Sequence, residues 1–377
     1  MRLLVLLAVV IGCEKPAAKK ADAISESDAQ TFVQKFQAAM MPCDQDAVAA
    51  LIDGDELAKD IEHEAKSSTA KIGAARFRDA HEISKILCAW QDGVESYHLL
   101  HLTMKDGTPR IIMRRIGRSP RSAVATVGYE RLLLDKHGPD VKLADVYSFT
   151  QGSSLSELLA TGMDAITDDG VASTFDTSAK LKESRTLQKE GKFAEALALL
   201  DGLPKEARES RMVQMARLRI SDQLSPEAYK QALEEIARLF PGDPSVALID
   251  VDGALLRGDY AQALKDIDTI DASIGGDAFQ NAIRAAVLRK RNSPGDLEKA
   301  AQLAESAVTA EPNLAKGWWS RLDVAVQRKQ YKLAVETMAQ LQTRFGAKFD
   351  EAKLRALPDY PAFLDSPEYT AWRGSAD

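Results

Sequence analysis

Few side chains in this 377-residue sequence have the type and spacing that chemistry requires. Asp145 and Tyr147 lie two residues apart, and on a β-strand that spacing places both side chains on one face. If the face lines a pocket, Asp145 could act as a base and Tyr147 as a hydrogen-bond donor. If it points outward, both are surface residues of a sheet. A lone carboxylate is weak evidence for catalysis, so we expect no catalytic residue and no enzymatic activity.

Motifs of common catalytic sites are absent from the sequence. It contains no Ser-His-Asp order with an elbow motif, Walker loop, GxGxxG fingerprint or HExxH helix. His98 and His101 are three residues apart, which on a regular strand puts them on opposite faces and argues against a metal pair. The sequence therefore predicts neither a metal nor a cofactor.

Cys13 ends a short apolar segment that follows one charged residue, Arg2. The segment is too short to cross a membrane as a helix, which needs about 20 residues, but it suits the core of a secretory signal. The residues Val10-Ile11-Gly12-Cys13 resemble the lipobox of bacterial lipoproteins. In that family the cysteine thiol takes a diacylglycerol, the peptide is cut before the cysteine, and the new amine is acylated.

This resemblance implies a lipoprotein signal peptide over residues 1–12 and a lipid on Cys13. Residues 13–24, which contain three lysines and several alanines, are expected to form a flexible tether. The protein would then sit in the bacterial cell envelope facing the periplasm. Glu14 is not the usual aspartate retention signal of enteric bacteria, which favours the outer membrane. The alternatives are a plain secretory signal with an incidental cysteine, or a disordered apolar N-terminus.

The two remaining cysteines, Cys43 and Cys88, form an even number in a chain expected in an oxidising compartment. We predict a disulfide between them. The alternative is two buried free thiols that act as small hydrophobic side chains.

The composition is that of a globular protein, with 45% hydrophobic and 28% charged residues. The net charge of −7 argues against a nucleic-acid partner. Acidic residues dominate 44–64 and basic residues dominate 105–136. The basic segment could form a sheet face for an anionic partner. Alternatively, the two segments pair with each other and the remaining charges face solvent, which we favour.

Residues 25–171 show a helical pattern followed by a strand pattern. Helices are expected before residue 85, the last over 70–84. Four antiparallel strands are expected over 97–149, with Asp106-Gly107 as a hairpin turn. Another helix should follow to about residue 166. This order resembles the cystatin-like cone of the nuclear-transport-factor-two-like superfamily, in which helices pack across a curved sheet and leave a pocket.

Residues 175–346 contain a repeated pattern in which a turn is followed by a ring or apolar residue and, three residues later, a small residue. The ring or apolar positions are 31 to 37 residues apart. This period resembles the tetratricopeptide repeat, whose period is 34 residues, and about five units are present. The residues that carry the resemblance are Gly191, Phe193, Ala196, Tyr229, Ala232, Pro244, Gly258, Tyr260, Ala263, Gly295, Ala300, Pro312, Trp318, Tyr331 and Ala334.

In that family a proline closes the second helix of a unit, the position that Pro244 and Pro312 occupy here. The alternative is a generic bundle of alanine-rich helices. Residues 347–377 are expected to cap the last unit, with Leu357, Phe363, Tyr369 and Trp372 over its exposed face.

The sequence thus predicts an α+β N-terminal domain followed by an all-α tetratricopeptide solenoid. The function expected from this organisation is a membrane-anchored scaffold or assembly factor that binds envelope proteins through its repeat groove. The alternative is a small-ligand-binding or enzymatic cone near Asp145 and Tyr147 that the repeats recruit.

Overall fold

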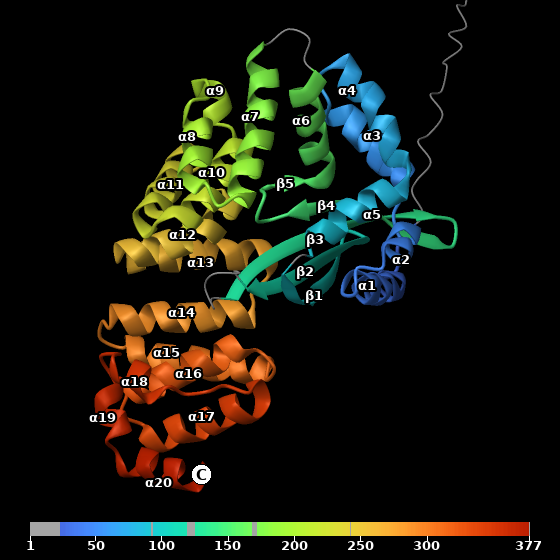
Figure 1. The fold of residues 1–377 in the computed structure, drawn as a ribbon. Coiled ribbons are helices and arrows are strands. Elements are labelled where there is room, and N and C mark those ends of the chain that lie inside the picture. Colours follow the sequence, from blue (N-terminus) through green and yellow to red (C-terminus); the bar gives the residue numbers. More distant parts are fainter. Residues whose placement is uncertain (1–22, 92, 119–124, 168–171, 242, 377) are drawn as a thin grey trace, which may run out of the picture.

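A computed structural model describes residues 23–376 except 92, 119–124, 168–171 and 242 (Figure 1). An α+β region comes first and an all-α array of helices follows, which confirms the predicted fold class. Cys13, the signal segment 1–12 and most of the tether 13–24 lie outside the described residues. Within the described part, no helix has both the length and the apolar character needed to span a membrane.

Six helical segments precede the sheet: α1 (Glu26–Met40), α2 (Gln45–Ala50), α3 (Gly54–Glu64), α4 (Ser68–Gly73), a 3₁₀ helix η1 (Ala74–Arg78) and α5 (Ala80–Ala89). Side-chain caps begin several of them, since Ser25, Asp44, Asp53 and Asp79 each accept a hydrogen bond from a backbone N–H of the first turn.

The single helix expected over 70–84 is wrong, because the chain forms α4, η1 and the start of α5 there. Asp79 has extended backbone dihedrals and caps α5, which ends the preceding helical segment. The backbone of η1 also passes against Gly54, where an added Cβ would lie 2.3 Å from the Arg78 carbonyl oxygen. Only glycine permits so close an approach of α3 and η1.

The sheet is antiparallel with the strand order β1-β2-β3-β4-β5. Its strands are β1 (Val94–Lys105), β2 (Thr108–Arg118), β3 (Ala125–His137), β4 (Asp140–Ser148) and the short β5 (Ser153–Ser154). Asp106 and Gly107 both have positive φ in the β1–β2 turn, as an Asp-Gly hairpin requires. Helix α6 (Leu155–Thr167) follows and packs with α3 and α4.

One face of the sheet carries the core of the α+β region. Side chains from α1, α3 and α5 meet the strands in one apolar cluster, in which Phe36, Ile61, Leu87 and Ile111 are almost fully buried. The helices therefore cover this face of the sheet, and the opposite face is left for another part of the chain.

Five helix pairs follow among the described residues. They are α7 (Ala172–Lys189) with α8 (Phe193–Asp201), α10 (Arg211–Leu224) with α11 (Pro226–Leu239), α12 (Pro244–Arg257) with α13 (Tyr260–Ile274), α14 (Ala278–Arg291) with α15 (Asp296–Ala310), and α16 (Ala315–Gln327) with α17 (Tyr331–Phe345). A short helix α9 (Lys205–Arg208) joins the first two pairs. Neighbouring helices along the chain contact one another through the array.

Residues of the repeat pattern occupy equivalent places in these pairs. The small residues Ala196, Ala232, Ala263, Ala300 and Ala334 are all buried in their helices. Gly258 ends α12 in the left-handed conformation, and Lys329 takes the same conformation before α17 although it carries a side chain. Ring residues Phe193, Tyr260 and Tyr331 begin the second helix of their pairs.

Two parts of the pattern differ from expectation. Tyr229 is the fourth residue of α11 rather than the first, because Ser225 and Pro226 begin that helix one turn earlier. Pro244 opens α12 instead of closing α11, which suits proline because the first helical position needs no backbone donor. Pro312 lies between α15 and α16, and its carbonyl accepts a hydrogen bond of 2.9 Å from the Trp318 indole.

The C-terminal helices are α18 (Glu351–Arg355), α19 (Tyr360–Leu364) and α20 (Pro367–Ala376). Phe363 and Tyr369 are buried against α16 and α17, and Trp372 packs at the edge of the same cluster. Leu357 is 44% exposed, so its expected place over the last pair is wrong.

We predict that Gly54→Ala lowers the free energy of unfolding by about 1–3 kcal/mol, because the new methyl overlaps the backbone of η1. Urea unfolding followed by circular dichroism measures this change. Gly162→Ala in α6 is the matched control, since an added Cβ there meets no atom within 4 Å and should raise stability by about 0.5–1 kcal/mol. Equal stability of the two variants would contradict the close contact.

Candidate interaction surface

Asp145 caps a helix instead of lining a pocket. Its carboxylate accepts hydrogen bonds from the Ser156 hydroxyl (2.6 Å), the Ser156 amide (3.3 Å) and the Val146 amide (2.7 Å). Burial raises the pKa of Asp145, and the bonds from Ser156 and Val146 counteract that shift. Both carboxylate oxygens therefore stabilise the start of α6, which explains this residue without a catalytic role.

Tyr147 lies in different surroundings. Its ring packs edge-on against Phe149 with centroids 5.2 Å apart, and the Arg131 guanidinium lies 5.2 Å from its centroid. The ring borders the cluster that joins the sheet to α12 and α13. The structure thus does not bring Asp145 and Tyr147 together as an acid–base pair.

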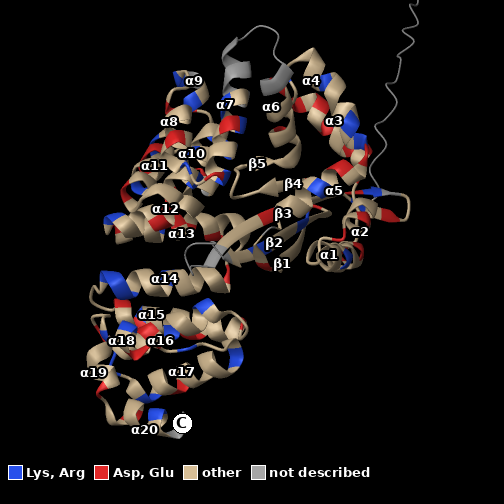
Figure 2. Ribbon diagram, viewed as in Figure 1, with Lys and Arg blue, Asp and Glu red and all other residues tan. Residues whose placement is uncertain are grey.

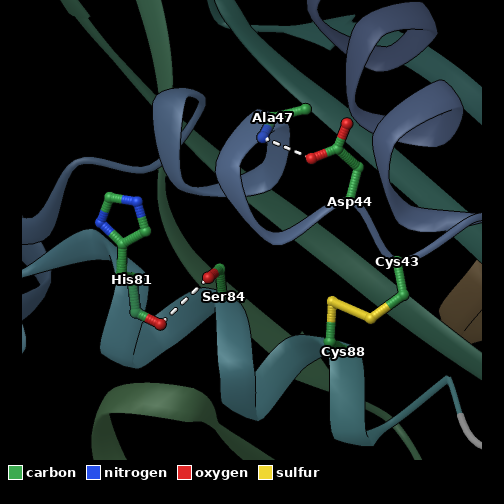
Figure 3. The surroundings of a disulfide bond; sticks show 6 residues. All are labelled: Cys43, Asp44, Ala47, His81, Ser84 and Cys88. Atoms are coloured by element: carbon green, nitrogen blue, oxygen red, sulfur yellow. Dashed lines mark hydrogen bonds between the residues drawn. A yellow bond between two sulfur atoms is a disulfide. The ribbon is translucent and has the colours of Figure 1, made fainter.

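A disulfide joins Cys43, in the turn after α1, to Cys88 near the end of α5 (Figure 3). The Cα atoms are 5.4 Å apart, within the usual range for a disulfide. Nearby, Asp44 caps α2 through the Ala47 amide, and the Ser84 hydroxyl donates to the His81 carbonyl. The bond fastens two of the N-terminal helical segments to each other.

The expectation that His98 and His101 point to opposite faces is wrong. A bulge lies between Leu99, which pairs with Met113, and His101, which pairs with Ile112. The extra residue restores His101 to the face of His98. The two side chains contact different groups: His98 Nε2 accepts from Arg114 at 2.6 Å, and His101 Nε2 lies 2.6 Å from the Gly276 carbonyl oxygen. Among the described residues, no three His, Cys, Asp or Glu side chains form a metal-binding group.

Arg114, in the middle of β2, is the largest fully buried side chain of the described residues. Its guanidinium forms ion pairs with Asp277, the N-cap residue of α14, and with Glu311 just after α15. The Tyr129 hydroxyl donates to the second oxygen of Asp277 at 2.6 Å and accepts from Gln280 at 2.9 Å. Burial raises the pKa of Asp277, and the adjacent Arg114 counteracts the shift. This network joins the sheet to the repeats.

Apolar side chains surround the network. Ile112, Tyr129 and Phe149 of the sheet region pack in one cluster with Ala247 and Val251 of α12. A second cluster brings Ile116 and Val127 against Phe279 of α14. The face of the sheet that the N-terminal helices leave open is therefore covered by helices of the repeat array, and Figure 1 shows the sheet reaching α13 and α14.

These contacts also revise the interpretation of the basic segment. Charges of both signs are interspersed over the helices (Figure 2). The acidic segment 44–64 forms ion pairs with His81, Arg78 and Lys59, none of which lies on the sheet. Arg114 instead pairs with acids of the repeats, and Arg110 donates to the Ser273 carbonyl at 2.6 Å. Arg114 and Arg110 of the basic segment are thus bound by the second half of the same chain. Arg115 pairs instead with Glu130 of β3, and Lys136 pairs with Asp28 of α1.

A groove of about 690 Å³ lies farther along the array, between α15 and α17 with α16 beneath. Its apolar lining includes Ala301, Ala304, Val324, Ala325 and Leu333. The repeat residues Ala300 and Ala334 lie in the same helices but do not line the groove. Ala304, Val324 and Ala325 are also buried, and the exposed part of the lining comes from polar residues of α15 such as Gln302 and Ser306. The sequence pattern identified residues that pack the pairs and did not point to these exposed positions.

Ion pairs hold the polar edge of this groove. Arg321 Nε lies 2.9 Å from Glu305 Oε2, and Arg328 Nη2 lies 2.5 Å from Glu298 Oε2. The Arg321 guanidinium also lies 5.4 Å from the centroid of the Trp318 ring, and Arg344 lies at the same distance from it. Both groove arginines are thus fixed by residues of the protein itself.

No protein-family model matches this sequence, and no curated protein matches it. One similar solved structure is described as MamA 41-end from Desulfovibrio magneticus RS-1, with 15% sequence identity and a TM-score of 0.38. The match covers 46% of this chain and 98% of that chain. Because the likeness is this weak, the assignment of repeats rests on the residue pattern and the five helix pairs.

A buried acidic pair lies between α12 and α13. Asp250 and Asp266 are 5% and 6% exposed, and Arg257 donates to Asp250 at 3.0 Å. Gln262 donates to one oxygen of Asp266, whereas the other oxygen has no hydrogen-bond partner in the described structure. Burial and then the charge of Asp250 raise the pKa of Asp266 to about 6.

We predict that Arg114→Met lowers the free energy of unfolding by about 3–5 kcal/mol, because Asp277 and Glu311 lose the charge that compensates them. Urea unfolding at pH 7.5 measures the loss. Arg110→Met is the control, since this arginine lies on the same strand but is exposed, and the variant should lose less than about 1 kcal/mol. Similar losses for both variants would contradict the central role of Arg114.

We predict that Asp266→Asn raises stability at pH 8 by about 1–3 kcal/mol. Since the folded-state pKa of Asp266 is raised, its ionisation destabilises the fold as pH rises through about 6, and the gain from asparagine should vanish below about pH 4. Thermal unfolding across this pH range tests the prediction, with the exposed Asp222→Asn as control. A gain that does not change with pH would refute it.

Proposed function

We propose that this protein is a scaffold that binds other proteins through its helical repeats while a lipid on Cys13 holds it on a bacterial membrane. The observation that carries the scaffold proposal is the open apolar groove on a regular array of helix pairs. Arrays of this kind present extended surfaces in which each pair contacts only its neighbours, and they commonly bind partner proteins.

The contact between the sheet and the repeats supports a scaffold that acts as one unit. Because Arg114 is buried between charges of α14 and the segment after α15, the α+β region cannot swing freely on a linker without exposing them. A partner held in the groove would therefore stand at a defined place relative to the α+β region.

Membrane attachment is supported by the sequence, through Arg2, the apolar segment after it and the lipobox-like Val10-Ile11-Gly12-Cys13. Two or more acyl chains would give durable anchoring, whereas a single chain binds a membrane only marginally. The Cys43–Cys88 disulfide agrees with a periplasmic location, since disulfides persist in oxidising compartments. We propose the periplasmic face of the outer membrane as the site of the anchor.

The rival function, a ligand-binding or catalytic cone in the α+β region, has less support. Asp145 is used to cap α6, and Tyr147 packs against Phe149 and Arg131 at the border of the repeats. Neither environment offers a free acid or base beside a substrate cavity.

We predict that a photo-crosslinking amino acid at Gln302, an exposed residue of the groove, captures a defined protein in the cells that make this chain. The same amino acid at Glu195, exposed on α8 of the first pair, is the matched control and should capture little of it. Cys13→Ser should release the chain from membranes collected by sedimentation, and it should reduce the yield of the cross-linked adduct.

Each half of this proposal can fail separately. Absence of a protein adduct at Gln302 and at other exposed repeat positions would overturn the scaffold. Membrane retention of the Cys13→Ser variant would overturn the lipid anchor.

A further inference from the structure

We propose that the contact between the sheet and the repeat array is a pH-sensitive switch, which is stable while the His98 imidazole is neutral and weakens when the ring takes a proton. The contact consists of the buried network around Arg114 and the two apolar clusters beside it. The inference concerns the two halves of this chain, so it does not depend on what the repeat array binds.

Arg114 fixes the protonation state of His98. The two residues face each other across β1 and β2, and His98 Nε2 lies 2.6 Å from Arg114 Nη2. A guanidinium has donors only, so Nε2 accepts this hydrogen bond and carries no proton. The ring is therefore neutral in the closed contact, with its single N–H on Nδ1.

A proton on His98 Nε2 would disturb the bonds of the buried guanidinium. Arg114 Nη1 donates to Asp277 and Glu311, and Arg114 Nη2 donates to Glu311 and His98. These four bonds use all the hydrogens of the two terminal nitrogens. Protonation would therefore set one N–H against another, take an acceptor from a buried charge and add a second positive charge beside it.

The charges around His98 agree with this geometry. Burial lowers the pKa of His98, and the charge of Arg114 lowers it further, whereas Glu311 and Asp277 act in the opposite direction without reversing the shift. A histidine whose pKa is lower in the closed contact than in the open chain stabilises the contact above the ordinary value of about 6.5. That stabilisation is lost as pH falls through the lower value, so mild acid weakens the contact.

The other groups of the network with shifted pKa values respond differently. Burial raises the pKa of Asp277, so its own protonation favours the closed contact and opposes the effect of His98. Burial also raises the pKa of Tyr129 well above its ordinary range, so this hydroxyl stays neutral. Burial works against the charge on Arg114, but Glu311 and Asp277 outweigh it and raise the pKa of the guanidinium. Of these groups, His98 is the one whose protonation weakens the contact.

His101 provides a comparison on the same face of the sheet. Its Nε2 lies 2.6 Å from the Gly276 carbonyl oxygen, which can only accept, so this nitrogen donates. The neutral ring with its proton on Nε2 and the charged ring can both make this bond. His101 thus joins β1 to the turn before α14 in either charge state, whereas the bond from Arg114 to His98 requires a neutral ring.

The test is hydrogen–deuterium exchange of the full chain at pH 7.5 and at about pH 5, with rates corrected for the intrinsic effect of pH. In the unmodified chain, amides of residues 275–281, where the turn before α14 meets the sheet, should exchange at least threefold faster at the lower pH. Amides of α17, which lies away from this contact, should keep their corrected rates.

Two matched variants assign the response to one imidazole. His98→Gln keeps an acceptor for Arg114 and cannot take a proton, so its corrected exchange over residues 275–281 should be the same at both pH values. His101→Gln keeps a donor for the Gly276 carbonyl and should retain the acid response. Asp277 is present in both variants, so its opposing effect cancels in the comparison. Circular dichroism at both pH values confirms that each variant remains folded.

A second measurement decides the matter if His98→Gln loosens the contact at both pH values. NMR titration of the unmodified chain follows the imidazole signals, with His98 assigned by elimination through variants of the other four histidines. The His98 ring should titrate below about 6.5, over the pH range in which exchange increases.

Equal corrected exchange of the unmodified chain at the two pH values would overturn the switch. An unchanged acid response in His98→Gln, or its loss in His101→Gln, would overturn the role of His98. A His98 ring that titrates at or above about 6.5 would also overturn it, because protonation then does not weaken the contact.

Discussion

The burial of the Arg114 guanidinium is the constraint on which the relation between the two halves of this protein depends. A charge removed from water is tolerated only where opposite charges and hydrogen-bond partners surround it. Asp277 and Glu311 provide them from positions 163 and 197 residues away in the chain. Since neither the sheet nor the repeats alone can satisfy these groups, the network favours one arrangement of the two regions.

In this arrangement some surfaces of the repeat array are buried against the sheet and others remain accessible. Residues of α12 and α14 cover the open face of the sheet, so their surface is used inside the molecule. The groove between α15 and α17 lies beyond this contact and remains available. The tetratricopeptide resemblance implies a binding surface on the array as a whole, whereas in the tertiary structure part of α12 and α14 is covered by the sheet.

The sequence predicted an element correctly where the residues that determine it are neighbours in the chain or recur with a regular period. The Asp106-Gly107 turn, the four main strands and the buried alanines of the repeats depend on neighbouring residues or on a regular period. Prediction failed where a distant segment intervened. Gly54 lies against η1, and the bulge at Leu100 turns His101 toward Gly276. The acids that pair with the buried Arg114 lie in the repeats rather than in α3.

The sequence by itself determined the order of helices and strands, the repeated helix pairs and the candidate lipid attachment at Cys13. Each of these depends on residue type and spacing along the chain. Only the tertiary structure decided that Asp145 caps α6, that Arg114 joins the sheet to the repeats, and that a groove lies between α15 and α17. Those properties depend on which surfaces are buried against each other, and these surfaces belong to residues far apart in the sequence.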